Sequence, residues 1–120
     1  MVHAVVCDDY EPILRLIEVV LKGMGILATV TQEGCEALDL VRKLRPGLII
    51  SDVDMPGLDG ISLFKEVQSD SCELAGTPFI LMSLVDRKWE ALEAGCHYFL
   101  TKPFSIEDLK DTVRQSLSIR

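Results

Sequence analysis

A buried strand that ends on an acidic residue is the feature of this sequence that most restricts its fold. The apolar, β-branched run Leu48 to Ile50 is typical of a strand covered on both faces of a sheet. Asp52 stands two residues after this run, although an unpaired carboxylate at the edge of a core is costly. Turn-forming residues follow from Met55 to Gly60. The stretch therefore predicts a core strand that presents one carboxylate at its carboxyl end. The alternative at this point is an aspartate that only caps the next turn.

Short apolar runs and stretches with apolar residues at helical spacing alternate along the whole chain. Strands are predicted at residues 2–7, 27–31, 48–51, 79–82 and 98–100, and helices at 11–24, 35–44, 61–68, 86–94 and from 105 onward. The polar stretch 69–77 is predicted as a loop. Alternation of this kind indicates an α/β fold, a doubly wound parallel sheet with helices on both faces. With no repeat and no long linker, residues 1–120 are expected to form one domain.

Two local predictions concern the last two helices. Ser105 followed three residues later by Asp108 is a capping-box-like start for the last helix. In the helix at 86–94, Asp86 is expected to cap the first turn and Trp89 to pack inward.

Polar residues follow four of the five predicted strands. In chain order they are Asp8, Asp9, Asp52, Ser83 and Lys102. Sites in doubly wound folds form outside the carboxyl ends of the strands, at the point where the strand order reverses. These side chains are therefore expected to meet at one edge of the sheet.

Phosphoryl chemistry suits this set of groups. Three carboxylates brought together raise one another's pKa unless a counter-charge is present, and Mg²⁺ prefers oxygen ligands of this kind. The ammonium of Lys102 and the hydroxyl of Ser83 suit the oxygens of a phosphoryl group. Asp52 is then the nucleophile that forms an aspartyl phosphate.

Charge and cysteine content exclude several other classes of protein. A formal net charge of −7 argues against nucleic acid or an anionic membrane as a direct partner. The start of the chain is unlike a signal peptide, and no apolar run approaches the roughly 20 residues of a membrane span, so a cytoplasmic protein is expected. The four cysteines show no CxxC spacing and are expected to be reduced thiols.

The sequence resembles the receiver domains of two-component response regulators over essentially its whole length. Four segments carry the likeness: residues 5–10, 48–60, 79–83 and 99–104. The resemblance implies the flavodoxin-like strand order 2-1-3-4-5. It also implies a regulatory phosphoacceptor domain, not an enzyme acting on separate substrates. Such a domain takes its phosphoryl group from a histidine kinase or phosphotransfer protein, needs Mg²⁺, and signals to a downstream protein or output domain.

The same resemblance assigns roles at the acidic end of the site. Asp52 is similar to the phosphoacceptor of the family. Asp9 is similar to a direct Mg²⁺ ligand, and Asp8 to the residue that holds a metal-bound water. Asp54 is expected to offer its backbone carbonyl to the metal. On the residues alone, Asp8 as a helix cap remains an alternative.

The resemblance assigns the remaining roles to residues of the fourth and fifth strands. Ser83 looks like the hydroxyl that moves onto the phosphoryl oxygen, and Phe99 like the aromatic that follows it inward. Lys102 looks like the phosphate-pairing lysine, and its bond to Pro103 is expected to be cis. The alternatives are a mere strand-end hydroxyl for Ser83 and a core position for Phe99.

Two departures from the family concern the segment after Ser83. Leu84 stands where the family usually has Ala or Gly, so its bulk is expected to narrow access to the phosphoryl group. The segment 83–95 is about three residues shorter than the common pattern. The helix at 86–94, the fifth strand and the last helix form the surface that passes the signal on in the family, so partner binding is expected to be unusual.

The lifetime of the phosphoryl group depends on the side chains near the attacking water. By analogy with the family these are Asp54 and Val85. Val85 offers no hydrogen bond, and Leu84 crowds the approach, so a comparatively long-lived aspartyl phosphate is expected.

Two alternatives come from other classes of protein. Asp52-Val53-Asp54 is similar to the DxD motif of haloacid-dehalogenase-type phosphatases, but Met55 stands where that motif favours Thr or Val. The second alternative is a receiver-like interaction module that is not phosphorylated. Leu84 and the short loop favour it, and the intact acidic, hydroxyl and lysine residues argue against it.

Overall fold

All five predicted strands are present in the computed structural model, which describes residues 2–84 and 87–118. The strands are β1 (His3–Cys7), β2 (Leu27–Thr31), β3 (Leu48–Asp52), β4 (Phe79–Ser83) and β5 (Tyr98–Thr101). The helices are α1 (Glu11–Gly23), α2 (Gly34–Leu44), α3 (Gly60–Asp70), α4 (Cys72–Ala75), α5 (Lys88–Ala94) and α6 (Ile106–Ser118). Each strand boundary lies within one residue of its prediction.

The strands form one sheet in the order β2-β1-β3-β4-β5, and every neighbouring pair is parallel. This confirms the predicted α/β class and strand order. The order reverses between β1 and β3, which pair from Ala4 with Leu48 to Cys7 with Ser51. The carboxyl ends of β1 and β3 therefore lie side by side, where a site is expected in this fold.

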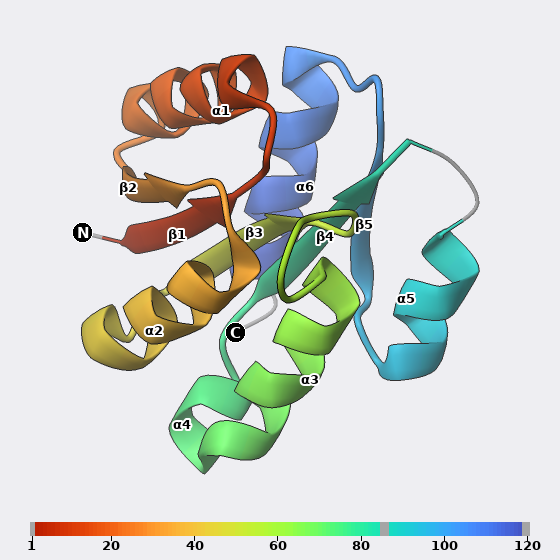
Figure 1. Ribbon diagram of the computed structural model, residues 1–120. Helices are drawn as coiled ribbons and strands as arrows, with labels where there is room; N and C mark the ends of the chain where they lie inside the picture. Colours follow the sequence, from red (N-terminus) through yellow and green to blue (C-terminus); the bar gives the residue numbers. More distant parts are fainter. Residues whose placement is uncertain (1, 85–86, 119–120) are drawn as a thin grey trace.

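Helices cover both faces of the sheet (Figure 1). Alternate side chains of each strand point to opposite faces, so neighbouring residues of one strand enter different cores. Val5 and Ile49 pack with residues of α2, α3 and α5, whereas Val6 and Ile50 pack with residues of α1 and α6. Complete burial of one such side chain stabilises the fold by about 1.5–3 kcal/mol.

Glycine at position 60 allows the chain to fold back tightly behind the acidic end of β3. A Cβ atom at Gly60 would lie 2.1 Å from the backbone oxygen of Asp52, so no other residue fits without movement of the backbone. The Gly60 amide donates a hydrogen bond to the oxygen of Val53 at 2.8 Å, and Asp59 caps the following helix α3 through Ser62. This packing fixes the course of the loop that leaves Asp52.

The prediction of a loop over residues 69–77 was wrong in two respects. Helix α3 continues to Asp70, and α4 occupies four residues of the stretch. The Ser71 side chain accepts a hydrogen bond from the Leu74 amide at 3.1 Å, and Leu74 is buried. One capping residue and one buried leucine stabilise a turn of helix that is too short to show a helical repeat in the sequence.

The orientation predicted for Trp89 was also wrong. Its side chain is 72% exposed, and Ala91 is the residue of α5 that is buried. Two residues correspond to about 200° around a helix, so burial of Ala91 turns Trp89 toward solvent. Asp86, the predicted cap, and Val85 lie outside the described residues.

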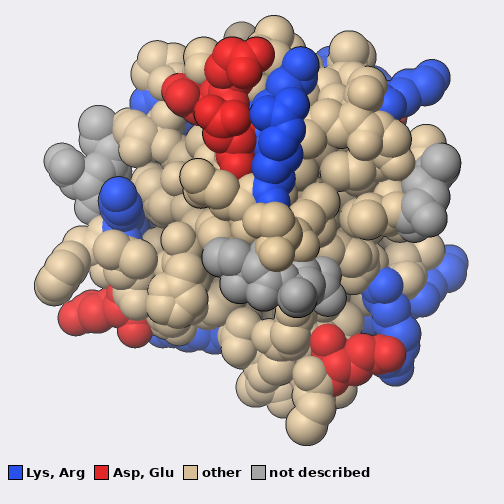
Figure 2. All heavy atoms as spheres, turned by 180° about the vertical axis from the view of Figure 1, so that it is seen from behind, with Lys and Arg blue, Asp and Glu red and all other residues tan. Residues whose placement is uncertain are grey.

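The capping box of α6 is confirmed. The Asp108 amide donates to the Ser105 hydroxyl at 3.0 Å, and the Ser105 amide donates to the Asp108 carboxylate at 3.3 Å. Within the described part of the chain, no helix is long and apolar enough to cross a membrane. On the side turned away in Figure 1, basic side chains lie beside acidic ones or apart from one another (Figure 2).

Candidate functional site

Lys102 joins the carboxylates that end β1 and β3. Its Nζ lies 2.6 Å from Oδ2 of Asp8 and 3.0 Å from Oδ1 of Asp52. Asp8 is fully buried, Asp52 is 5% exposed, and the Lys102 side chain is 13% exposed. Because charges this far from water need a partner, the Lys102 ammonium provides the counter-charge that the two carboxylates share.

Asp8 also holds the start of helix α1. Its Oδ1 accepts a hydrogen bond from the Tyr10 amide at 2.9 Å, and Tyr10 is the residue that precedes the helix. Asp8 is thus hydrogen-bonded to the residue before α1 as well as lying in the acidic site, although the N-cap position itself is Tyr10, whose side chain makes no capping hydrogen bond.

The predicted acidic residues are brought together. Asp8, Asp9 and Asp52 each offer a carboxylate oxygen, and these three oxygens all lie within 4.8 Å of one another. Asp8 and Asp52 are buried, whereas Asp9 is exposed at the rim. A set of carboxylate oxygens with one side open to solvent suits Mg²⁺, which takes oxygen ligands and keeps several waters.

The surroundings of Asp52 raise its pKa from 3.8 to about 6. Burial is the largest cause, and the carboxylates of Asp8 and Asp9 act in the same direction. The hydrogen bond from Lys102 opposes this rise. Burial alone would lower the pKa of Lys102, but its hydrogen bonds to the two carboxylates raise it above the ordinary value. Lys102 therefore remains an ammonium beside Asp52.

Ser83 provides an unpaired hydroxyl at the end of β4. The residue is 1% exposed, and its Oγ has no hydrogen-bond partner among the described residues. Leaving a buried hydroxyl unpaired costs about 1–3 kcal/mol. The Lys102 amide donates to the Ser83 carbonyl at 2.6 Å, so a backbone hydrogen bond joins these two residues. A buried hydroxyl without a partner, on a residue hydrogen-bonded through its backbone to Lys102, suits an anionic oxygen bound in the site.

A cavity of about 430 Å³ opens over Asp9, Asp52 and Lys102. Its charged lining consists of Asp9, Asp52, Asp54 and Lys102, and its other lining residues are Tyr10, Ile13, Leu84 and Pro103. Leu84 is 65% exposed and lies at the wall of the cavity. Its predicted effect on access remains a prediction.

The structure bears in different ways on the other residues that the sequence analysis singled out. The peptide bond between Lys102 and Pro103 is cis, as predicted. Phe99 is half-buried and packs against the core below α3 and α5, which leaves its switching role a prediction. Cys7 is fully buried, and burial, followed by the nearby Asp8 and Asp52 charges, raises the pKa of its thiol to about 12. Cys7 is thus a poor nucleophile.

One charged residue beside the site escaped the sequence analysis. The Arg87 guanidinium, just before α5, donates from Nη1 to Oδ1 of Asp54 at 2.6 Å. The two residues are 33 positions apart, and nothing in the local sequence of either one signals the contact.

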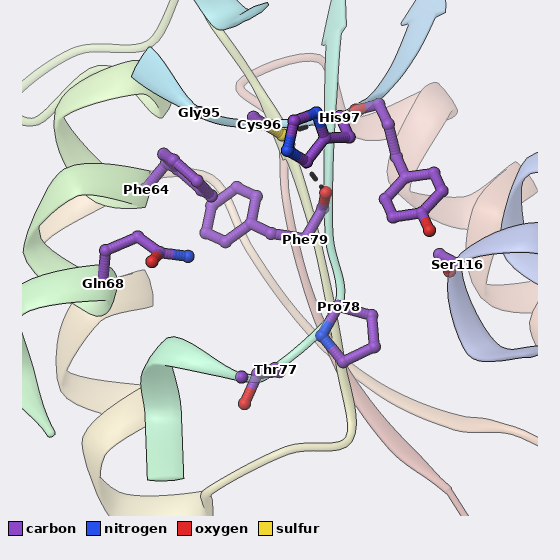
Figure 3. A pocket seen from close by; sticks show the side chains of 11 residues that line it. Phe64, Gln68, Thr77, Pro78, Phe79, Gly95, Cys96, His97 and Ser116 are labelled. Carbon is purple, nitrogen blue, oxygen red and sulfur yellow. Dashed lines mark hydrogen bonds between the residues drawn. The ribbon is translucent and has the colours of Figure 1, made fainter. Parts of the chain in front are cut away.

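A second cavity lies at the opposite ends of β4 and β5 (Figure 3). It measures about 250 Å³, and its wall includes the edge-to-face pair Phe64 and Phe79, whose ring centroids are 5.1 Å apart. Cys96 and Ser116 also line it, and none of its lining residues in the described ranges 2–84 and 87–118 is Asp, Glu, Lys or Arg.

Comparison with known proteins gives a single family. The family model for the response regulator receiver domain matches residues 4–114. Among curated proteins, the DNA-binding response regulator MtrA of Mycolicibacterium paratuberculosis is 31% identical over 115 residues. The match covers 93% of this chain and 49% of MtrA, so the chain spans about half the length of this relative.

Solved structures give the same result. The receiver domain of the Francisella response regulator 1452 is 35% identical, with a TM-score of 0.89 and coverage of 99% of this chain and 98% of that one. The receiver domain of the sensor histidine kinase PA1611 from Pseudomonas aeruginosa PAO1 shares the fold, with a TM-score of 0.87, 22% identity and 98% coverage of each chain. That domain is described with a magnesium ion coordinated in its active-site cleft.

Proposed function

Because this chain belongs to the response regulator receiver domain family of two-component systems, we propose that it accepts a phosphoryl group on Asp52. One observation supports this proposal above the others. The Asp52 carboxylate ends β3 within 3.0 Å of the Lys102 ammonium, and carboxylate oxygens of Asp8 and Asp9 lie within 4.8 Å. The chain is thus proposed to act over residues 1–120 as a regulatory phosphoacceptor domain.

Asp52 acts as the nucleophile in this proposal. One of its oxygens forms a bond to phosphorus while the bond from phosphorus to the donor atom breaks, and the donor atom keeps the electron pair. Lys102 pairs with a phosphoryl oxygen, and the unpaired hydroxyl of Ser83 donates to another. Phe99 is proposed to follow Ser83 inward as the switching aromatic.

Magnesium is proposed as the cofactor, since the family binds it in its acidic site. Asp9 and Asp52 are the proposed direct ligands, Asp54 contributes its backbone carbonyl, and Asp8 holds a metal-bound water. When bound, the ion neutralises charge that develops on the phosphoryl oxygens. The magnesium of the PA1611 receiver domain agrees with this proposal.

The proposed partners are a histidine kinase or phosphotransfer protein and a downstream protein or output domain, all in the cytoplasm. The surface formed by α5, β5 and α6 is proposed to pass the signal on. Trp89 on α5 is 72% exposed and offers an apolar contact there. The relative MtrA is named as a DNA-binding protein, but we propose no direct contact between this domain and nucleic acid.

Intact-mass measurement after incubation with acetyl phosphate and Mg²⁺ tests the proposal. A single added phosphoryl group is expected on the parent protein and none on Asp52→Asn. Asp39→Asn, which removes an exposed carboxylate of α2, should be labelled like the parent. Labelling of Asp52→Asn at the parent rate would contradict the proposed acceptor. No labelling of a folded parent would favour the receiver-like module that is not phosphorylated.

A further inference from the structure

The Asp54 carboxylate lies at the edge of the cavity over Asp52 and Lys102, which is called the phosphorylation cavity from here on. Asp54 lines the cavity together with Asp52 and Lys102, and its side chain is 62% exposed. The expected metal contact of Asp54 uses only its backbone carbonyl. Its side chain therefore adds a negative charge, beyond the expected metal contact, at the mouth of a site proposed to admit phosphoryl groups.

Arg87 determines where this carboxylate lies. Its Nη1 donates to Oδ1 of Asp54 at 2.6 Å, across from the segment that precedes α5. The rest of the guanidinium is fixed by Glu90, which accepts from Nε at 2.7 Å and from Nη2 at 3.3 Å. Arg87 is thus anchored on α5 and holds Asp54 from there.

Arg87 itself does not line the cavity, whereas Asp54 does. Small phosphodonors such as acetyl phosphate are dianions near neutral pH. A carboxylate that turns into the cavity would face them at close range, and the repulsion is worth about a three- to tenfold change in rate.

We propose that Arg87 is a positioning residue for phosphoryl transfer, which holds the Asp54 carboxylate at the rim and out of the path of an anionic phosphodonor. The proposal rests on phosphorylation of Asp52 as described above. It adds a residue outside the acidic site that controls how readily the site accepts its substrate.

The test measures phosphorylation rates by intact mass, with acetyl phosphate as donor and Mg²⁺ at saturation for each variant. Arg87→Gln should slow the reaction about three- to tenfold. Arg87→Lys can still pair with Asp54 and should recover most of the rate. In the Asp54→Asn background, Arg87→Gln should change the rate less than twofold. Thermal melts confirm that each variant is folded.

The matched control is Arg45→Gln. Arg45 pairs with Glu73, another exposed ion pair between distant segments, and Arg45 does not line the phosphorylation cavity. This variant should react at the parent rate. A drop like that of Arg87→Gln would show that loss of any surface pair slows the reaction, and would overturn the proposal.

Phosphoramidate carries less negative charge than acetyl phosphate. It therefore tests whether the effect of Arg87→Gln on the rate depends on the charge of the phosphodonor. The effect of Arg87→Gln should be smaller with this donor. Equal slowing with both donors, or equal slowing in the parent and Asp54→Asn backgrounds, would overturn the positioning role. A parent that is not phosphorylated at all would refute the proposed function and this inference together, whereas a phosphorylated parent with an unaffected Arg87→Gln refutes only the inference.

Discussion

The two ends of strands β4 and β5 carry cavities of opposite character. At the carboxyl ends, Lys102 contacts the carboxylates of Asp8 and Asp52, and the hydroxyl of Ser83, the last residue of β4, has no partner among the described residues. At the amino ends, two polar groups that line the cavity, the Cys96 thiol and the Ser116 hydroxyl, are paired within the protein (Figure 3). The Ser116 hydroxyl donates to the Val113 carbonyl at 2.9 Å.

The Cys96 thiol and the aromatic rings at the amino ends also have partners within the protein. The Cys96 thiol donates to the Phe79 carbonyl at 3.2 Å, and Phe79 packs edge-to-face on Phe64. Polar groups satisfied internally contribute to stability, whereas unpaired and mutually repelling groups are costly unless a ligand completes them. We therefore expect substitutions at the amino ends to change stability, and substitutions at the carboxyl ends to change ligand binding.

The largest expected effect on stability belongs to Phe79→Ala. Phe79 is 3% exposed, and its removal leaves a cavity beside Phe64, which should lower the free energy of unfolding by about 3–5 kcal/mol. Urea denaturation measures the change. Phe79→Leu should lose less, and at a temperature where it is fully folded it should be phosphorylated at the parent rate. A folded Phe79→Leu protein that is phosphorylated tenfold more slowly would break the proposed division between the two ends.

Asp52→Asn should raise the free energy of unfolding, whereas Phe79→Ala lowers it. The reason is that the ionised Asp52 opposes folding in the absence of a divalent cation. Its pKa is raised from 3.8 to about 6, so between these pH values the folded protein binds more protons than the unfolded chain. Stability from this group is present below about pH 3.8 and is lost as the pH rises through 6. At pH 7.5 without Mg²⁺, Asp52→Asn should be more stable by up to about 3 kcal/mol, because each tenfold change in the acid dissociation constant corresponds to about 1.4 kcal/mol.

The same measurement at lower pH provides the control for Asp52→Asn. The gain should shrink as the pH falls from about 6 to 3.8, because the carboxyl of the folded parent is then protonated. Asp111→Asn removes an exposed carboxylate on α6 and should change stability by less than about 0.5 kcal/mol at either pH. A pH-independent gain in Asp52→Asn would show that repulsion and burial of the charge are not its cause.

Magnesium should stabilise the parent by relieving the same repulsion. At ten times its dissociation constant, the ion should add about 1.4 kcal/mol, visible as a rise in melting temperature. Asp9→Ala should abolish most of this rise, and Asp111→Ala should retain it. An equal rise in Asp9→Ala would place the metal away from the three carboxylates.

The sequence predicted the carboxyl ends better than the amino ends. Asp52 and Ser83 end their strands and Lys102 follows β5, and parallel pairing brings residues at these positions to one edge of the sheet whatever the loops do. The capping box at Ser105 was equally predictable because both partners are three residues apart. Local patterns and strand order therefore account for the fold and for the acidic site.

The features that were missed depend on contacts between distant segments. The Arg87–Asp54 ion pair joins two loops, and the exposure of Trp89 follows from which face of α5 meets α3 and the sheet. The cavity beside Phe79 needs residues of four elements, α3, β4, β5 and α6, to form its wall. Contacts between residues far apart in the sequence produce no periodic pattern and no short spacing, so they can be recognised only in the folded structure.

The smallest stability effect, and the most specific one, is expected for Leu84→Ala. Leu84 is 65% exposed, so its truncation should change the free energy of unfolding by less than about 0.5 kcal/mol. It nevertheless lines the cavity beside Asp52 and Lys102. Hydrolysis of an aspartyl phosphate needs a water held in line with phosphorus, and a leucine at the wall restricts that approach. Leu84→Ala should therefore lose its phosphoryl group about two- to fivefold faster than the parent, as followed by intact mass after removal of the donor. Val19→Ala, a truncation of a 69% exposed residue of α1, should lose it at the parent rate. If Leu84→Ala keeps its phosphoryl group as long as the parent, Leu84 does not shield it.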